Sequence, residues 1–217
     1  MLSLKRSMLI SVEGIDGSGK STLVQALKTN LEGLQLPLVV TKEPGGTALG
    51  KQLRTLVQER TTPLCPQAEF LLFATDRAQH FNELIIPALE QGKLIISDRM
   101  ADSSLVYQGY GRGLDKDFIK MVNTWAMNNI VPDLTFYVRI SPEIAYQRLI
   151  ARKETLTAFE QEKREFFEKL AKGFDTLYAN RPDVIILDGT KDAQSIATKA
   201  TEDIINFLKL REITTLP

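Results

Sequence analysis

Residues 8–22 constrain the fold more than any other part of the chain. A short apolar run at 8–12 leads into Gly-Ile-Asp-Gly-Ser-Gly-Lys-Ser-Thr at 14–22, and apolar residues at helical spacing follow at 23–31. This is the G-x-x-x-x-G-K-[ST] pattern, placed between a strand and a helix. Glycines let backbone N–H groups surround phosphate oxygens, and the helix N-terminus adds positive potential. The pattern predicts a nucleoside triphosphate site; a glycine-rich turn without a ligand is the alternative.

Two residues of this loop have expected chemical roles. Lys20 should reach the β- and γ-phosphates, and the Ser21 hydroxyl should ligate Mg²⁺. A signalling GTPase would also need the guanine-reading string N-K-x-D, which the sequence lacks, so a kinase of small molecules is favoured. The residues expected to bind the triphosphate are Gly14, Ile15, Asp16, Gly17, Ser18, Gly19, Lys20, Ser21 and Thr22.

Short apolar runs alternate with longer amphipathic stretches along the whole chain. Continuous apolarity within the short runs is typical of parallel strands that are covered by helices on both sides. The pattern therefore predicts an α/β fold, a five-stranded parallel sheet with helices on both faces, in a single domain over residues 1–217. The strands are expected at 8–12, 38–40, 94–96, 134–138 and 184–187. The helices are expected around 23–31, 53–57, 68–89, 115–129, 142–152, 160–178 and 193–208.

Composition excludes several classes of protein. Lys and Arg number 27 and so do Asp and Glu, so bulk positive charge does not point to a nucleic-acid partner. One cysteine, Cys65, allows no internal disulfide, and with one histidine it cannot build a Cys/His zinc site. No run reaches 18 uninterrupted apolar residues, so no membrane span is expected, and the apolar-leaning run at 8–13 is too short for a secretory signal. These features suggest a soluble, cytoplasmic protein.

Further polar residues stand at the ends of predicted strands or at helical spacing, and each has a plain structural alternative. Asp98 ends a predicted strand, where its carboxylate can either hold Mg²⁺ or cap the following turn. Arg99 can either bind a phosphate through two guanidinium nitrogens or form a surface ion pair. Phe73 and Arg77 share one helix face, which suits a flat pyrimidine, although core packing explains the phenylalanine alone. Ser104 and Gln108, also at helical spacing, can donate to and accept from a base edge, or cap locally.

Several strings together resemble the bacterial thymidylate kinase family. They are Lys-Glu-Pro-Gly-Gly-Thr at 42–47, Leu-Phe-Ala-Thr-Asp-Arg at 72–77, Asp-Arg at 98–99 with Asp-Ser-Ser at 102–104, and Tyr-Gln-Gly at 107–109. Together with the phosphate loop, these strings follow one another in the same order as in the family, and the resemblance extends over residues 8–208. The resemblance implies a phosphate-loop nucleotide kinase fold with a short mobile lid at about 149–160. It also implies an enzyme that phosphorylates dTMP with ATP and Mg²⁺, and a homodimer formed through the helices at 68–89 and 115–129.

The resemblance also assigns roles to individual residues. Arg99 would lie between the acceptor and donor phosphates, Arg54 would hold the acceptor phosphate, and Asp16 would contact the sugar or phosphate of the acceptor. Phe73 would stack on thymine while Arg77 meets the base edge. The remaining residues implied for the acceptor site are Glu43, Ser104, Tyr107 and Gln108. Read without the resemblance, Arg54 would be a surface arginine, Asp16 a variable loop position and Glu43 part of a turn.

The lid departs from the family pattern. Asp16 is followed by glycine rather than arginine, and Thr157-Ala158 stand where the family has Asp-Arg before an apolar residue and glutamate. Arg152 and Lys153 are then the expected lid cations, with a solvated charge run as the alternative. Two other functions stay open at this point: a kinase of another nucleotide or nucleoside, and a nucleotide-binding module without turnover.

Overall fold

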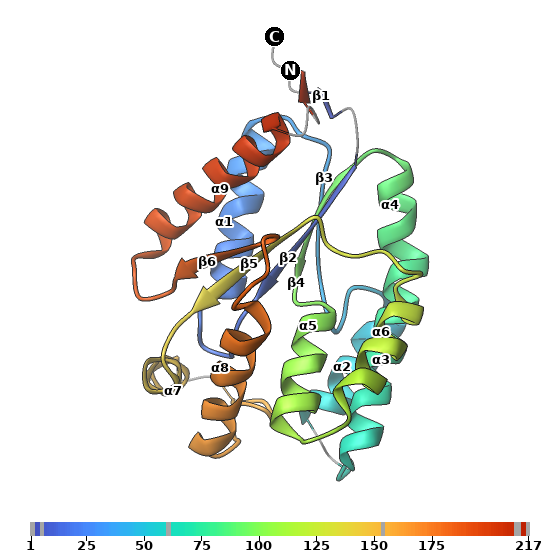
Figure 1. The fold of residues 1–217 in the computed structure, drawn as a ribbon, viewed down its shortest axis with the longest axis vertical. Coiled ribbons are helices and arrows are strands. Elements are labelled where there is room, and N and C mark those ends of the chain that lie inside the picture. Colours follow the sequence, from blue (N-terminus) through green and yellow to red (C-terminus); the bar gives the residue numbers. More distant parts are fainter. Residues whose placement is uncertain (1–2, 5–6, 60–61, 153–154, 211–213, 216–217) are drawn as a thin grey trace.

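The predicted parallel sheet is present, and the carboxyl ends of its strands all lie on the same side of the molecule. The computed structural model describes residues 3–4, 7–59, 62–152, 155–210 and 214–215. Within them a five-stranded parallel sheet has the order β3-β4-β2-β5-β6 (Figure 1). Its strands are β2 (Met8–Glu13), β3 (Leu38–Lys42), β4 (Leu94–Asp98), β5 (Leu134–Arg139) and β6 (Val184–Asp188). The register pairs Val12 and Lys42 with Asp98, so the loops after β2, β3 and β4 leave the sheet at the same level.

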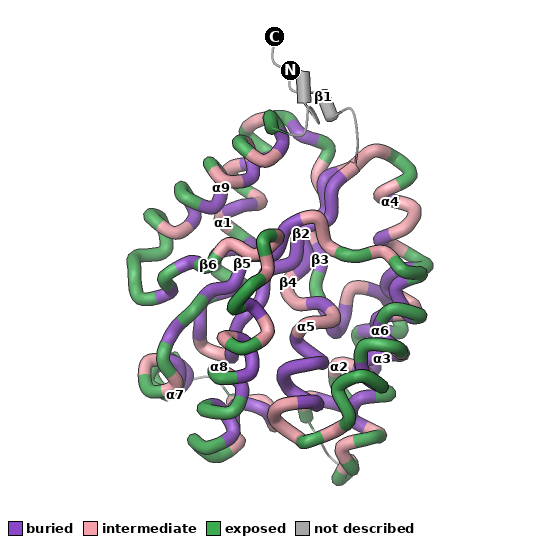
Figure 2. Tube along the Cα trace, viewed as in Figure 1, coloured by how far each residue is buried: buried purple, intermediate pink, exposed green. Residues whose placement is uncertain are grey.

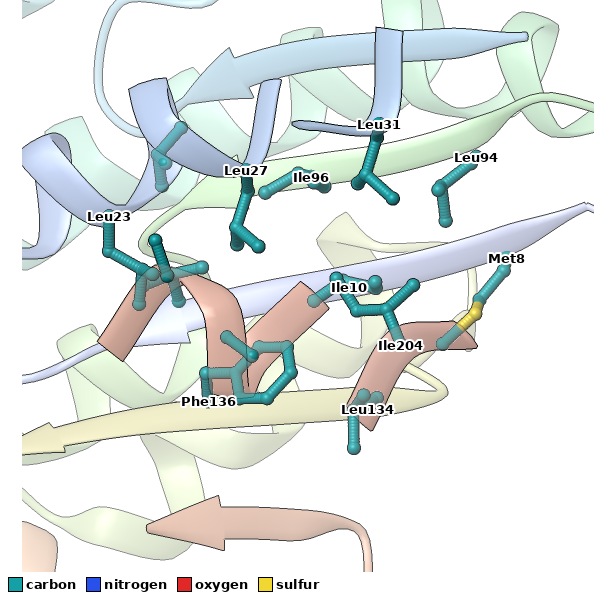
Figure 3. Close-up of a cluster of buried hydrophobic side chains, with 14 of the residues drawn as sticks. Met8, Ile10, Leu23, Leu27, Leu31, Leu94, Ile96, Leu134, Phe136 and Ile204 are labelled. Atoms are coloured by element: carbon teal, nitrogen blue, oxygen red, sulfur yellow. The ribbon is translucent and has the colours of Figure 1, made fainter. Parts of the chain in front are cut away.

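Helices cover both faces of the sheet, as the continuous apolarity of the strands predicts. On one face α1 (Lys20–Gly33) and α9 (Ala193–Leu210) lie side by side (Figure 1). Alternate residues of the strands point to this face, and Figure 3 shows Ile10, Ile96 and Phe136 meeting Leu27 of α1 and Ile204 of α9. This cluster is the largest apolar core among the described residues, and β2 is buried along its whole length (Figure 2).

The opposite face is covered by the helices that carry the predicted acceptor site. Leu9 and Ile95 point to this side and pack against Phe81 and Ile85. The segments on this side and around it are α2 (Ala48–Glu59), α3 (Pro66–His80), η1 (Phe81–Ile85), α4 (Ile86–Glu90), α5 (Ala101–Ser104), η2 (Leu105–Gly111), α6 (Lys116–Ala126), α7 (Pro142–Ala151) and α8 (Arg164–Tyr178).

Three element boundaries differ from the sequence prediction. The helix expected at 68–89 is interrupted by the π-helical turn η1 just before Pro87, which lacks the N–H that would continue the α-helical ladder. The helix expected from residue 160 begins at Arg164, because the backbone at 157–161 forms a turn closed by Thr157 and Glu160. A helical segment at 101–111 was not predicted, although the spacing of Ser104 and Gln108 indicated one.

The remaining short elements do not contribute to the site. Ser3–Leu4 (β1) and Thr214–Thr215 (β7) form a small antiparallel pair that the sequence did not predict. In the part of the chain that the structure describes, no helix combines the length and the apolar character that crossing a membrane requires.

Candidate active site

The loop after β2 has the conformation that a phosphate loop needs. Gly14 has a φ of +148° and Gly17 one of +80°, a region that side chains disfavour. A Cβ at Gly17 would lie 2.6 Å from the backbone oxygen of Ala145, so only glycine fits there. Lys20 begins α1, and its Nζ donates to the backbone oxygen of Ile15 at 2.8 Å, which folds the side chain back over the loop.

The Lys20 ammonium is surrounded by other charges. Burial and the positive charge of Arg99 lower its pKa to about 8, although Asp16, Asp98 and Glu13 act in the opposite direction. A phosphate anion near Nζ would add a further negative charge and favour the protonated lysine.

The two residues predicted to bind Mg²⁺ lie together, Ser21 in the first turn of α1 and Asp98 at the carboxyl end of β4. The Ser21 hydroxyl donates to the Asp98 carboxylate at 2.7 Å. A hydroxyl and a carboxylate oxygen beside a phosphate loop are the oxygen ligands that Mg²⁺ prefers, and Mg²⁺ usually takes only one or two protein ligands beside substrate phosphates. The chemistry of this pair therefore fits the ion.

Arg99 connects the phosphate loop to the segment at 101–111. One guanidinium nitrogen donates to the backbone oxygen of Gly14 at 2.9 Å and to Ser103 Oγ at 3.1 Å. The other forms an ion pair with Asp16 and donates to the Tyr107 hydroxyl at 3.0 Å. Tyr107 in turn donates to Asp16 at 2.9 Å. Although burial raises the pKa of Asp16, the charges of Arg99 and Lys20 hold it below its usual value, so this carboxylate stays ionised.

A buried carboxylate that sequence reasoning did not single out lies beside Arg99. Glu13 ends β2 and accepts from the backbone N–H of Met100 at 2.7 Å and from the Ser103 and Ser11 hydroxyls at 2.5 and 2.9 Å. Burial and the nearby Asp102 raise its pKa to about 7, against the lowering effect of these donors and of Arg99. Glu13 thereby holds the backbone that follows Arg99. Its position directly before the glycine loop was the only signal in the sequence.

The residues predicted to bind the acceptor base surround a second, smaller cavity. Its volume is about 60 Å³. The predicted residues that line it are Asp16, Glu43, Phe73, Arg77, Arg99, Ser104, Tyr107 and Gln108. Phe159 also lines it, with ring centroids 5.8 Å from both Phe73 and Tyr107. The prediction did not include Phe159; an apolar residue in an otherwise charged lid was the signal for it.

Arg77 is held by a buried network rather than left free at the base edge. Its side chain pairs with Glu43 at 2.7 Å and donates to Ser104 Oγ at 3.1 Å and to Asn123 Oδ1 at 2.7 Å. Glu43 also contacts His80 Nδ1 at 3.0 Å. Burial opposes ionisation of Glu43, but Arg77 and His80 lower its pKa below the usual value. Glu43 therefore orients Arg77, which explains a glutamate in a turn that otherwise needs only glycines.

A larger cleft of about 940 Å³ runs over the phosphate loop. Arg54 of α2 lines it and donates to the backbone oxygen of Pro44 at 2.9 Å. Burial lowers the pKa of Arg54, and among the carboxylates Asp98 counteracts this most strongly. Asp16, Glu43 and Arg99 line both the large cleft and the small cavity. Pro44, Gln58 and Thr157 line both spaces as well, so the cleft and the cavity meet along these six residues.

α7 brings cations to the far side of this cleft. Arg148 donates to the backbone oxygens of Ser18 at 3.4 Å and of Gly189 at 2.8 Å, so it lies against the phosphate loop. Arg152, the predicted lid cation, lines the cleft and is paired with Glu160. Lys153, the other predicted lid cation, lies outside the described residues. The lid is also fixed to α2, because the N–H of Ala158 donates to the backbone oxygen of Gln58 at 2.9 Å.

Comparison with known proteins agrees with this arrangement. The family model described as thymidylate kinase matches residues 12–200, which include the phosphate loop, both cavities and the lid. The chain belongs to the thymidylate kinase family.

Individual members of that family are similar over most of their length. A thymidylate kinase of Carboxydothermus hydrogenoformans is 41% identical over 191 residues, which cover 88% of this chain and 93% of that protein. One of an Exiguobacterium species is 40% identical over 204 residues, covering 93% and 96%. The crystal structure of thymidylate kinase from Ehrlichia chaffeensis superposes with a TM-score of 0.74 at 29% identity, covering 92% of this chain and 99% of that one. The expected phosphate-loop kinase fold is confirmed.

Proposed function

We propose that this chain transfers the γ-phosphoryl group of ATP to the 5′-phosphate of dTMP, giving dTDP and ADP. One observation carries the proposal: Asp16 and Arg99 line both the cleft over the phosphate loop and the cavity that holds Phe73 and Arg77. A nucleotide bound in each space would meet at Arg99. Membership of the thymidylate kinase family gives the acceptor and the donor.

The chemistry requires positioning and neutralisation of charge. An acceptor phosphate oxygen is already nucleophilic, so no strong base is needed. Lys20 would bind the donor phosphates, Arg99 would lie between donor and acceptor, and Arg54 would hold the acceptor phosphate. The guanidinium of Arg99 presents two nitrogens that are already oriented by Gly14, Ser103, Asp16 and Tyr107, so little reorganisation is needed during transfer.

Mg²⁺ would be held by Ser21 and Asp98 together with the phosphates of ATP. When bound, the ion neutralises charge on the phosphates. Among the described residues there is no cluster of three or more His, Cys, Asp or Glu side chains that could hold a metal alone. This is consistent with an ion that arrives with the nucleotide rather than with a permanent metal centre.

The acceptor base would lie between the Phe73 ring and the polar residues around Arg77. Phe73 would stack on the pyrimidine, and the donors of Arg77 would meet a carbonyl oxygen of the base. Ser104 and Gln108 would complete the base edge, with Tyr107 near the sugar. Phe159 of the lid would close the cavity opposite Phe73.

We also propose that the protein is a single cytoplasmic domain that pairs with a second copy of itself. α6 exposes Phe118, Met121 and Trp125, and α3 exposes Leu71. The two helices pack together, with the Phe70 and Phe118 ring centroids 6.4 Å apart, so these side chains belong to one surface. An exposed apolar surface of this kind favours a protein–protein contact, and it lies on the two segments from which dimerisation was expected.

Measurement of ADP release with each nucleoside monophosphate in turn tests the proposal. ADP formation that depends on dTMP and saturates with it supports dTMP kinase activity. If another nucleotide or a nucleoside is phosphorylated faster than dTMP, that compound rather than dTMP is the acceptor. ATP binding without ADP formation from any acceptor would instead identify a nucleotide-binding module that has lost turnover.

A further inference from the structure

A buried carboxylate on α3 contacts a residue of the acceptor cavity from behind. Glu69 is 1% exposed, and its Oε1 accepts from Gln108 Nε2 at 2.8 Å. Arg112 Nε lies 3.2 and 3.3 Å from its two oxygens. Glu69 itself is absent from the lining of the cavity, whereas Gln108 lines it together with Phe73 and Arg77.

This contact determines which end of the Gln108 amide faces the cavity. Beside the Arg112 guanidinium Glu69 is a carboxylate, and a carboxylate can only accept hydrogen bonds. The amide must therefore turn its N–H₂ toward Glu69. Rotation by half a turn would place Oε1 against the carboxylate and leave a buried group without a donor. Gln108 Oε1 makes no hydrogen bond to the residues that the structure describes, and it remains available to a ligand in the cavity.

The cavity thus presents an acceptor at Gln108. Arg77, which also lines the cavity, keeps N–H groups that its buried network does not use, among them Nε–H. A guanidinium has no acceptor, so Arg77 suits a carbonyl oxygen and disfavours an amino group. A free amide oxygen suits a ring N–H. Thymine and uracil carry an N3–H beside the O4 carbonyl, whereas cytosine has an unprotonated N3 beside a 4-amino group. The arrangement of donors and acceptors therefore matches the first two bases and opposes the third.

We propose that Glu69 is a positioning residue that fixes the Gln108 amide with its oxygen toward the acceptor base, so that the site selects a pyrimidine with N3–H against cytosine. The inference rests on the proposed function, because it assumes that a pyrimidine nucleotide occupies this cavity. It assigns Glu69 no contact with the substrate.

Glu69→Gln tests this role, because a glutamine at position 69 can donate or accept and allows both orientations of Gln108. The kcat/KM values for dTMP, dUMP and dCMP would be measured with the parent and with the variant. The ratio for dTMP over dCMP should fall by roughly tenfold or more, the scale of leaving one buried hydrogen-bonding group unmatched. The ratio for dTMP over dUMP should not change, since these bases differ only in a methyl group.

Two matched variants separate this effect from general damage. Glu162→Gln removes the other partner of Arg112, which lies 2.6 Å away, and should keep the parent ratios. Glu69→Asp retains an acceptor-only carboxylate and should restore most of the selectivity lost in Glu69→Gln. An unchanged ratio for dTMP over dCMP in a folded Glu69→Gln protein would overturn the inference. Failure of the parent to phosphorylate dTMP would overturn the proposed function instead.

A measurement on the unsubstituted protein remains decisive if Glu69→Gln does not fold. In an NMR spectrum of the dTMP complex, N3 of the base should show a scalar coupling through the hydrogen bond to Cδ of Gln108, because the amide oxygen accepts from N3–H. A Gln108 amide whose N–H₂ group faces the base and that shows no such coupling would contradict the inference.

Discussion

Arg99 stands where β4 ends, with a φ of +72° that residues other than glycine rarely adopt. The Glu13 carboxylate holds the next peptide N–H, and the Ser97 hydroxyl donates to the Arg99 carbonyl oxygen at 2.7 Å. These contacts stabilise a backbone conformation that directs the guanidinium back toward the phosphate loop. This backbone conformation is locally unfavourable in free energy, and it is retained because it places the guanidinium at the phosphate loop.

Replacement of Arg99 should therefore affect turnover more than binding. We expect Arg99→Ala to lower kcat by roughly 10²–10³-fold, the scale of losing one preoriented charge in phosphoryl transfer. Arg139→Ala is a matched control, because Arg139 is exposed and pairs with Asp175 at 2.8 Å away from both cavities. Steady-state kinetics with ATP and dTMP measure both variants. Equal kcat for Arg99→Ala and the parent would show that Arg99 is structural.

Glu13 should make the stability of the protein depend on pH. Its pKa rises from 4.5 to about 7 in the folded state. Between these values the folded protein keeps a proton that the unfolded chain has released, so the free energy of unfolding should fall as the pH rises, by up to about 3 kcal/mol. Asp76, whose pKa burial raises to about 6, adds to the same slope.

Denaturant unfolding at pH 5 and at pH 7.5 measures this slope. Glu13→Gln carries no titrating group and should flatten the slope without removing it, because Asp76 remains. Glu90→Gln, an exposed carboxylate on α4, should keep the parent slope. A Glu13→Gln slope equal to that of the parent would mean that Glu13 is not the titrating group.

For individual residues, the sequence predicted the side chains that line the site better than it predicted the buried groups that hold those side chains in place. Residues 16–22 of the phosphate loop and Phe73, Arg77, Ser104 and Gln108 follow from a motif or from helical spacing, and they line the two cavities. Glu13 and Glu69 could not be found in this way, because their partners Met100, Gln108 and Arg112 lie 39 to 87 residues away. Only the folded chain brings a buried carboxylate to its distant donors.

Among the elements, α7 contributes more to the site than its sequence suggested. The expected lid cations were Arg152 and Lys153, because Thr157-Ala158 stand where the family has Asp-Arg. The structure adds Arg148, one helical turn before Arg152 and within hydrogen-bond distance of the phosphate loop. The helix α7 therefore carries Arg148, so the positive charge on this side of the cleft does not come from the lid alone.

Removing this charge should weaken the interaction with ATP selectively. We expect Arg148→Met to lower kcat/KM for ATP by roughly tenfold, a typical scale for a lost charge-assisted contact, with little change in KM for dTMP. Arg164→Met removes an exposed arginine that pairs with Glu143 and Glu168, and it should behave as the parent does. A parent-like kcat/KM for ATP in Arg148→Met would place Arg148 outside the nucleotide site.

The strands were easier to predict than the helix boundaries. All five strands of the main sheet were located from apolar runs: β2, β4 and β5 are buried on both faces, and the edge strands β3 and β6 are partly buried but still carry continuous apolar runs. The π-helical turns η1 and η2 have no comparable periodicity, since they shift the side chains relative to an α-helix. η2 carries Tyr107 and Gln108, so the geometry of the acceptor cavity depends on an irregular helix that spacing alone describes only approximately.

For the whole molecule, the surface shared by α3 and α6 determines the expected assembly. Trp125 is 76% exposed and Met121 61%, which is unusual for side chains of this size. We expect the protein to sediment as a dimer at micromolar concentration and Trp125→Asp with Met121→Asp to sediment as a monomer. Tyr146→Asp on α7, an exposed aromatic residue away from α6, should remain dimeric. A monomeric parent in analytical ultracentrifugation would contradict the proposed homodimer.

The two spaces that share Arg99 should bind ATP and dTMP for direct transfer of a phosphoryl group. The most direct measurement follows a labelled γ-phosphate from ATP into product in the presence of dTMP and Mg²⁺. The label should appear in dTDP in equal amount to the ADP formed, and omitting dTMP should abolish release of ADP. Label found only in inorganic phosphate, or transferred to another acceptor in preference to dTMP, would contradict this expectation.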